Sequence, residues 1–270
     1  MVSYGDILLN ALKFSIQPKR WLPFFLVDTV FLLFGIAYFL SNASYFINMV
    51  ASVQSNPATF LSLFNIAIIA FMGLIVWALL KLYISGAIIH QSVKPKELGK
   101  SWEVARKRYL SLLAVSIIMT GLTAVVNFVP YIGWVFAIIL GLMFFFVRAA
   151  VVAKTLNFDN SIRDSYHIFR NRVGTVFLIW LAVLLISLLI TTIFLIPTIV
   201  IAWNIIAPLI FQVSSPSVAS LILSSLLDNI WSILIGIEIV LVGMAISNVF
   251  KLKAETDFYL RFKKKRLGLF

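Results

Sequence analysis

Three long stretches of this chain, residues 29–80, 109–147 and 173–227, contain no Lys, Arg, Asp or Glu. They are 52, 39 and 55 residues long. One membrane crossing needs about 20 apolar residues, so each stretch has the length of two crossings. All 22 Lys and Arg residues lie in the segments that bound these stretches, and none lies where a stretch must turn around. This one-sided distribution follows the positive-inside rule. We therefore expect three hairpins in the cell membrane, with both termini cytoplasmic.

Composition indicates the same class of protein. Hydrophobic residues make up 62% of the chain and charged residues 12%, which leaves too few polar side chains to cover a soluble protein of 270 residues. The net charge of +12 raises the question of nucleic-acid binding. However, the basic residues adjoin apolar spans, so the expected partner is a lipid bilayer with anionic head groups, and we expect no nucleic-acid partner. The absence of Cys excludes disulfides, thiolate catalysis and Cys-ligated metals.

The expected fold is all-α, a polytopic membrane protein with six transmembrane helices. Hydrophobic length places these helices at about residues 21–41, 60–90, 109–128, 131–153, 174–204 and 219–250. The first apolar run is too long for the apolar core of a signal peptide, so we expect an uncleaved helix. Residues 1–250 are predicted to form a single transmembrane domain of three units, 1–95, 96–158 and 159–250. Residues 251–270 are predicted to form a basic cytoplasmic amphipathic tail.

Two segments between the spans resemble each other. Residues 100–108 and 164–172 align without a gap, with one Ser and two Arg in common and an aromatic residue after each Ser. In both segments the apolar residues recur at helical spacing, which predicts an amphipathic interfacial helix before each hairpin. Residues 4–21 resemble a looser third copy. The alternative is that any cytoplasmic loop between spans gathers Arg and aromatic residues, but the gapless register favours a true internal repeat.

The segment from Phe146 to Arg172 carries a family resemblance. A span end is followed by Lys154-Thr155-Leu156-Asn157-Phe158-Asp159 and then by a helix with Asp164-Ser165-Tyr166. This order resembles the multi-pass membrane domain attached to some glycerophosphodiester phosphodiesterases, and it is similar to free-standing six-helix membrane proteins of archaea and bacteria. The resemblance implies an accessory membrane bundle. The catalytic domain of those phosphodiesterases has no counterpart here, so no catalytic residue is carried over.

Four charged residues fall inside the predicted spans: Asp28, Lys81, Arg148 and Glu238. A charge inside a membrane costs about 2.5 kcal/mol or more, so such residues need a partner or access to water. At about 1.5 Å per residue, Asp28, Lys81 and Arg148 lie at similar depth, which predicts a pair between Asp28 and either base. Alternatively, Lys81 and Arg148 extend to the head groups.

Glu238 lies near the middle of the predicted sixth helix. It either lines a polar pathway or is one satisfied, buried carboxyl group. On the opposite side of that helix, small residues recur at helical spacing, which predicts close contact with another helix: Ser232, Gly236, Gly243 and Ser247. We therefore expect the sixth helix to be buried on two faces.

The tail carries a second candidate site. Lys263, Lys264, Lys265 and Arg266 follow an apolar stripe of Phe258, Tyr259 and Phe262. Such a segment is expected to lie on the inner leaflet and to bind anionic lipid, with each basic residue contributing about 1 kcal/mol. The alternatives are that these charges only fix topology, or that they bind a ribosome or a partner protein.

No catalytic motif is present in the sequence. It lacks the zinc-protease, phosphate-loop, dinucleotide-binding and nucleophile-elbow patterns, and Ser85 and His90 have poor helical spacing for a nucleophile and its base. We expect no enzyme activity, no cofactor and no metal. The leading prediction is a non-enzymatic scaffold or accessory component, with other membrane proteins as partners. The alternative is a small transporter or lipid-handling pathway that uses Glu238 and the group Asp28, Lys81 and Arg148.

Overall fold

The computed structural model describes residues 3–42, 58–210, 225 and 228–266, and these residues form helices joined by short connections. The predicted turns at residues 41–59 and 207–217 lie largely outside this part of the chain. The described helices are α1 (Tyr4–Ser15), α2 (Pro18–Ser41), α4 (Ala58–Val93), α5 (Leu98–Asn127), α6 (Gly133–Met143), α7 (Val147–Ala153), α8 (Phe158–Asn171), α9 (Val173–Ile210) and α11 (Ile230–Arg266).

Six helical segments are long and apolar enough to cross a membrane: Pro18–Tyr38, Phe64–Val93, Leu98–Asn127, Gly133–Ala153, Val173–Ala207 and Ile230–Lys263. The predicted class, an all-α multi-pass membrane protein, is therefore confirmed. The longest described helix, α9, has 38 residues. At about 1.5 Å per residue such a helix is longer than the roughly 30 Å of a bilayer's hydrocarbon core, so it must tilt or project.

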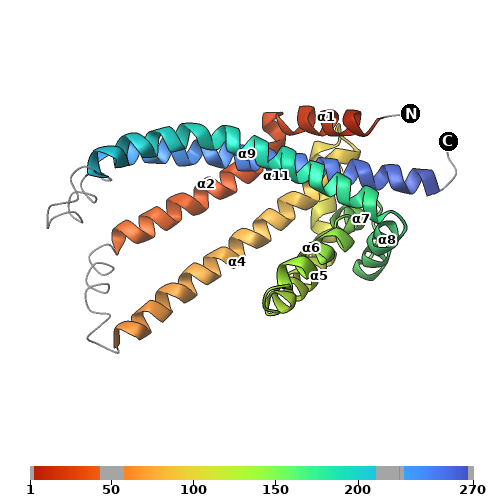
Figure 1. The fold of residues 1–270 in the computed structure, drawn as a ribbon, viewed down its shortest axis with the longest axis horizontal. Helices are drawn as coiled ribbons and strands as arrows, with labels where there is room; N and C mark the ends of the chain where they lie inside the picture. The colour runs from red at the N-terminus through yellow and green to blue at the C-terminus, as the bar shows by residue number, and fades with distance from the viewer. Residues whose placement is uncertain (1–2, 43–57, 211–224, 226–227, 267–270) are drawn as a thin grey trace.

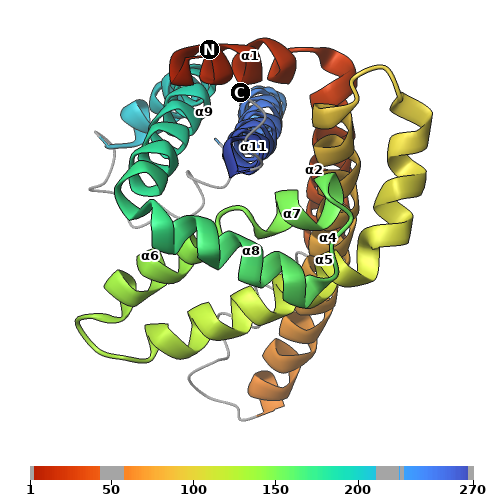
Figure 2. The same cartoon turned by 90° about the vertical axis from the view of Figure 1, so that its right-hand side faces the viewer.

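Helices α2, α4, α9 and α11 run side by side along the long axis of the molecule (Figure 1). The start of α2, the end of α4, the start of α9 and the end of α11 lie at one end, together with α1 and α8. We call this the termini-bearing end. The view onto that end shows α1 lying across the bundle, α11 between α9 and α2, and α5 and α6 inclined to the long helices (Figure 2).

The packed core lies towards the termini-bearing end. Buried side chains gather there from several helices, among them Phe250 and Phe258 of α11 and Val176 of α9, together with Phe146 just before α7. Elsewhere the long helices expose large apolar side chains, for example Phe34, Phe71, Leu188 and Trp203. Such continuous apolar faces are unfavourable in water, whereas lipid tails are as apolar as these side chains and can cover them. The distribution of burial therefore fits a protein held in a bilayer.

The tail does not form a separate element up to Arg266. α11 continues without interruption from Ile230 to Arg266, because no Gly or Pro follows Gly243 within this helix. Phe258, Tyr259 and Phe262, the apolar stripe of the predicted tail, are packed inside the protein, where these residues are 1%, 0% and 4% exposed. Residues 100–108, which the sequence predicts as a separate interfacial helix, instead form one continuous helix, α5, with the span that follows them.

The predicted helix at residues 131–153 is broken instead. α6 ends at Met143 and α7 begins at Val147. Ser165 of α8 lies at this break: its Oγ donates a hydrogen bond to the carbonyl of Met143 at 2.7 Å and accepts one from the amide of Phe146 at 3.2 Å. The hydroxyl thus satisfies backbone groups that a continuous helix would have paired within itself.

Candidate functional site

The first two intramembrane charges lie against each other. Nζ of Lys81 in α4 lies 3.0 Å from both carboxylate oxygens of Asp28 in α2. The indole of Trp77 donates a further hydrogen bond of 2.7 Å to Oδ1 of Asp28. The Asp28 side chain is 3% exposed and that of Lys81 is 15% exposed. Of the predicted alternatives, the structure pairs Asp28 with Lys81 rather than with Arg148.

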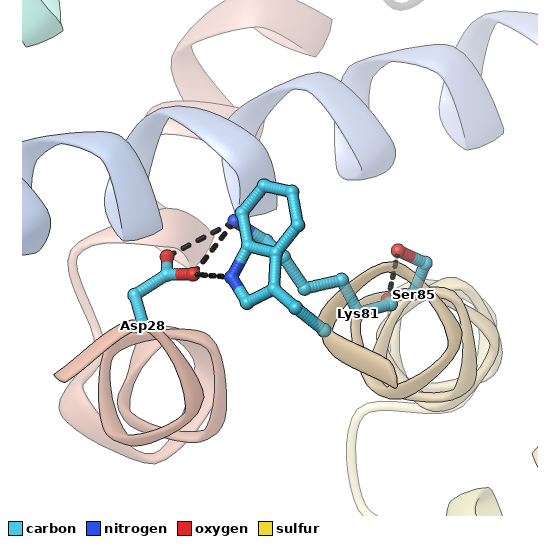
Figure 3. Close-up of polar contacts among 4 residues, drawn as sticks. Asp28, Lys81 and Ser85 are labelled. Carbon is cyan, nitrogen blue, oxygen red and sulfur yellow. Dashed lines mark hydrogen bonds and ion pairs between the residues drawn. The ribbon is translucent and has the colours of Figure 1, made fainter. Parts of the chain in front are cut away.

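Local features of α4 hold Lys81 in this position. Trp77 precedes it by one turn, and Nζ of Lys81 lies 4.3 Å from the centroid of the Trp77 ring, which is cation–π distance. Ser85 follows by one turn and donates its hydroxyl hydrogen to the carbonyl of Lys81 at 2.7 Å (Figure 3). Ser85 therefore makes no nucleophile–base contact with His90, and Nδ1 of His90 lacks a hydrogen-bond partner among the described residues.

Arg148 is placed differently from the expectation. It lies in the first turn of α7, and its Nη2 lies 3.5 Å from Oε1 of Glu255 in α11. Glu255 is 7% exposed at the side chain, and its Oε2 has no hydrogen-bond partner in the described part of the chain. Sequence reasoning missed Glu255 because it assigned the residue to the tail. The available signal was spacing: Glu255 shares a helical face with Phe258, Tyr259 and Phe262.

Glu238 lies apart from these charges. Its Oε2 accepts a hydrogen bond of 2.8 Å from Oγ1 of Thr29 in α2, and the side chain is half-buried. On the opposite face of α11, the carbonyl of Gly236 accepts a hydrogen bond of 2.7 Å from Oγ1 of Thr198 in α9. α11 is therefore packed between α2 and α9, with Glu238 on one side and the small residues on the other.

A cleft of about 820 Å³ lies among α2, α4, α5, α7 and α11. This volume is within the roughly 300–1,000 Å³ typical of small-molecule sites. Three of its lining residues are cations: Lys81, Arg148 and Lys251. Glu238 is not among the lining residues. The cleft thus joins two members of the predicted charge group with Lys251, which the sequence did not single out, and leaves Glu238 outside.

The cleft changes polarity along its length. α4 runs towards the termini-bearing end, so its lining residues pass from Ile75 to Ser85, a distance of about 15 Å. The end near Ser85 holds the cations, whereas the end near Ile75 is uncharged and mostly apolar, with Thr120 one turn from Ile117 on α5. Ile75 and Ile117 at this end are 38% and 62% exposed. The remaining lining residues are apolar or aromatic (Phe24, Trp77, Ala78, Leu79, Leu82, Leu113, Gly121 and Leu252) or polar and uncharged (Ser116, Thr120 and Asn248).

No protein-family model, curated protein or solved structure matches this chain. The residues of the cleft therefore have to be interpreted from their own chemistry. Among the described residues, no group of three or more His, Asp or Glu side chains is arranged to hold a metal ion. The lining instead offers ammonium, guanidinium, hydroxyl and amide donors to a ligand that accepts hydrogen bonds.

The basic cluster of the tail is described only in part. Lys263 pairs with Asp164 of α8, which also accepts a hydrogen bond of 2.6 Å from the hydroxyl of Tyr259. These contacts fasten the last turns of α11 to α8. The side chains of Lys264, Lys265 and Arg266 lie outside the described part of the chain. Lipid binding by these four residues remains a prediction.

Proposed function

We propose that this integral membrane protein is a non-enzymatic lipid-handling protein that takes a lipid or lipid-like amphiphile into the cleft. The polarity of the cleft supports this proposal most directly. Lys81, Arg148 and Lys251 line one end, while the other end is uncharged, mostly apolar and exposed at Ile75 and Ile117. An amphiphile has the same order of polar and apolar parts, so its head would lie at the cations and its tail along α4 and α5.

A scaffold or accessory function was the leading prediction from the sequence. A scaffold needs a surface that binds a partner, but lipid alone accounts for the exposed apolar side chains of the long helices. A scaffold also has no need of a cation-lined cleft. The described side chains therefore favour lipid handling, and binding of other membrane proteins stays a prediction.

The proposed topology has three hairpins and both termini in the cytoplasm. Its support is that α1, α8 and the ends of the long helices gather at one end of the molecule, where the basic segments also lie (Figure 1). In this topology the cationic end of the cleft lies in the inner leaflet. The interfacial helix of the third unit corresponds to α8, and that of the first unit to α1.

The proposed repeat of the units has support from two serines. Ser101 and Ser165, which match in the gapless alignment, are both fully buried. Ser101 accepts a hydrogen bond of 2.8 Å from Nε2 of Gln91 in α4, and Ser165 bonds the backbone at the break between α6 and α7. In each case the hydroxyl ties an amphipathic segment to another part of the chain. The resemblance to phosphodiesterase-associated membrane domains remains part of this proposal.

Lipid retention tests the proposed function. The protein is extracted from membranes in a mild detergent, and native mass spectrometry then measures the lipid that stays bound. We expect one lipid per protein chain to survive detergent washing that removes loosely bound lipid. Protein that carries no lipid under these conditions would contradict the proposed function.

A matched pair of glycine variants locates the retained lipid. Gly121 lines the cleft, and a Cβ at this position has no neighbouring atom within 4 Å, so a side chain can start there, and we expect Gly121→Leu to occupy part of the cleft. Gly141 has equally open surroundings but does not line the cleft. We expect Gly121→Leu to reduce retained lipid severalfold and Gly141→Leu to leave it unchanged. Equal retention in both variants would place the lipid elsewhere.

A further inference from the structure

The charges around the cleft do not balance. Its lining includes Lys81, Arg148 and Lys251, but no Asp or Glu of the described chain. Two carboxylates lie behind these cations: Asp28 pairs with Lys81, and Glu255 lies 3.5 Å from Arg148. Three cations therefore face two carboxylates. One positive charge of the cleft remains without a counter-charge.

Lys251 and Arg148 share this excess charge, because the single carboxylate of Glu255 interacts electrostatically with both. Lys251 lies on α11, one helical turn before Glu255, and is half-buried. Within the residues that the structure describes, its Nζ makes no hydrogen bond or ion pair, whereas Lys81 has Asp28 and Lys253 has Asp257. The counter-charge of Lys251 is Glu255, which it shares with Arg148. A half-buried ammonium that shares its counter-charge attracts an anion more strongly than an exposed one, because less water screens it.

The neighbouring polar groups suit an anion as well. Arg148 is half-buried, and its pair with Glu255 at 3.5 Å is long, so its guanidinium has donors to spare. The amide of Asn248 lies one turn before Lys251 on the same helix and also lines the cleft. Together these side chains offer charged and neutral donors at one place.

We infer that the cleft selects amphiphiles with an anionic head group, and that Lys251 is the residue that sets this selectivity. The inference rests on the proposed function and names its ligand class. The shared chemistry is a phosphate or carboxylate head on an apolar tail. The head accepts hydrogen bonds from Lys251 and Arg148, and the tail lies against Ile75 and Ile117 at the uncharged end.

Competition between lipids tests this inference. The protein is reconstituted in nanodiscs with equal amounts of zwitterionic phosphatidylcholine and anionic phosphatidylglycerol, released into mild detergent, and its retained lipid is measured. A single unscreened charge near a membrane surface is expected to favour the anionic lipid about five- to tenfold. Lys251→Gln should bring the ratio close to one, and Lys251→Arg should preserve the preference.

Two further variants separate the cleft from the general charge of the protein. Lys107→Gln removes the same charge from the exposed surface of α5, where Lys107 pairs with Glu103, and should leave the ratio unchanged. Ser116→Asp adds a carboxylate to the cleft lining and should lower retention of the anionic lipid while Lys251 stays in place. This second variant keeps the test decisive if Lys251→Gln does not fold.

The source of the anionic head is distinguished by replacing phosphatidylglycerol with oleate in a second set of nanodiscs. Enrichment of phosphatidylglycerol alone identifies a phosphate head, and enrichment of oleate alone identifies a carboxylate head. Equal retention of anionic and zwitterionic lipid by the unmodified protein would overturn the inference while lipid binding itself stands. Identical lipid ratios in Lys251→Gln and Lys107→Gln would overturn it too. Failure to retain any lipid would overturn the proposed function as well.

Discussion

The ammonium of Lys81 and the carboxylate of Asp28 lie 3.0 Å apart between α4 and α2, and both side chains are largely buried. A buried ion pair is weak evidence for added stability, but the loss of one partner leaves an uncompensated charge. The pair therefore fixes how α2 and α4 meet beside the cleft.

This relationship predicts the outcome of a double-mutant cycle. Asp28→Asn or Lys81→Met alone should lower the free energy of unfolding by about 3–5 kcal/mol, because each leaves a buried group without its partner. The double variant should be more stable than the sum of the two single changes predicts. Unfolding in detergent, followed by the fluorescence of the seven Trp residues, measures all three variants. Additive effects would show that the two residues do not interact.

The break between α6 and α7 predicts a specific role for Ser165. Ser165→Ala removes the partner of the Met143 carbonyl and of the Phe146 amide, so it should cost about 1–3 kcal/mol of stability. Ser161→Ala is the matched control on the same helix. Ser161 is equally buried, but its hydroxyl donates only to the carbonyl of Asn157, one turn earlier. Ser165→Ala should have a clearly lower midpoint temperature of thermal unfolding than Ser161→Ala. The reverse order would contradict this role of Ser165.

The contact of α9 with α11 depends on Gly243. A Cβ at this position would lie 2.5 Å from Cβ of Phe194, so Gly243→Ala should separate the helices and destabilise the protein by about 1–3 kcal/mol. Gly73→Ala provides the comparison, since no atom lies within 4 Å of that added Cβ, and a helical Gly→Ala change is otherwise stabilising. Thermal stability in detergent distinguishes the two. A harmless Gly243→Ala would mean that the helices are not in close contact.

Glu238 is expected to contribute structure rather than ligand binding. In Glu238→Gln the amide oxygen still accepts the hydrogen bond from Thr29, so stability should change by less than about 1.5 kcal/mol. Lipid retention should be unaffected, because the residue does not line the cleft. The comparison is Lys251→Gln, which is expected to alter the lipid ratio. Loss of lipid retention in Glu238→Gln would place this carboxyl group on the pathway after all.

The membrane class can be predicted from the sequence because it depends on the length of the charge-free stretches, not on which side chains are in contact. The charge-free stretches exceed what any soluble fold needs, and the six apolar helices follow from their length. Helix continuity depends on local contacts instead. Residues 144–146 contain no Gly or Pro, so the break there has no sequence signal, and Ser165, which bonds its backbone, lies 19 residues later in the chain than Phe146.

The sequence predicts the charged pairs of the site only as far as the depth of each residue in the membrane decides them. Depth placed Lys81 near Asp28, but it did not decide between Lys81 and Arg148, since that choice depends on which helices are neighbours. The partner of Arg148, Glu255, was assigned to a tail on the membrane surface. Its burial required α11 to continue as one helix, which in turn required packing against α1, α7 and α8.

The proposed topology places the termini-bearing end in the cytoplasm, and the sidedness of three residues tests this most directly. The chain has no Cys, so single-cysteine variants of the exposed residues Lys96, Lys154 and Tyr131 carry one reactive thiol each. Intact cells are treated with a membrane-impermeant maleimide. We predict that Tyr131→Cys is labelled from outside, and that Lys96→Cys and Lys154→Cys are labelled only after the membrane is opened. Labelling of Lys96→Cys or Lys154→Cys in intact cells would contradict the account.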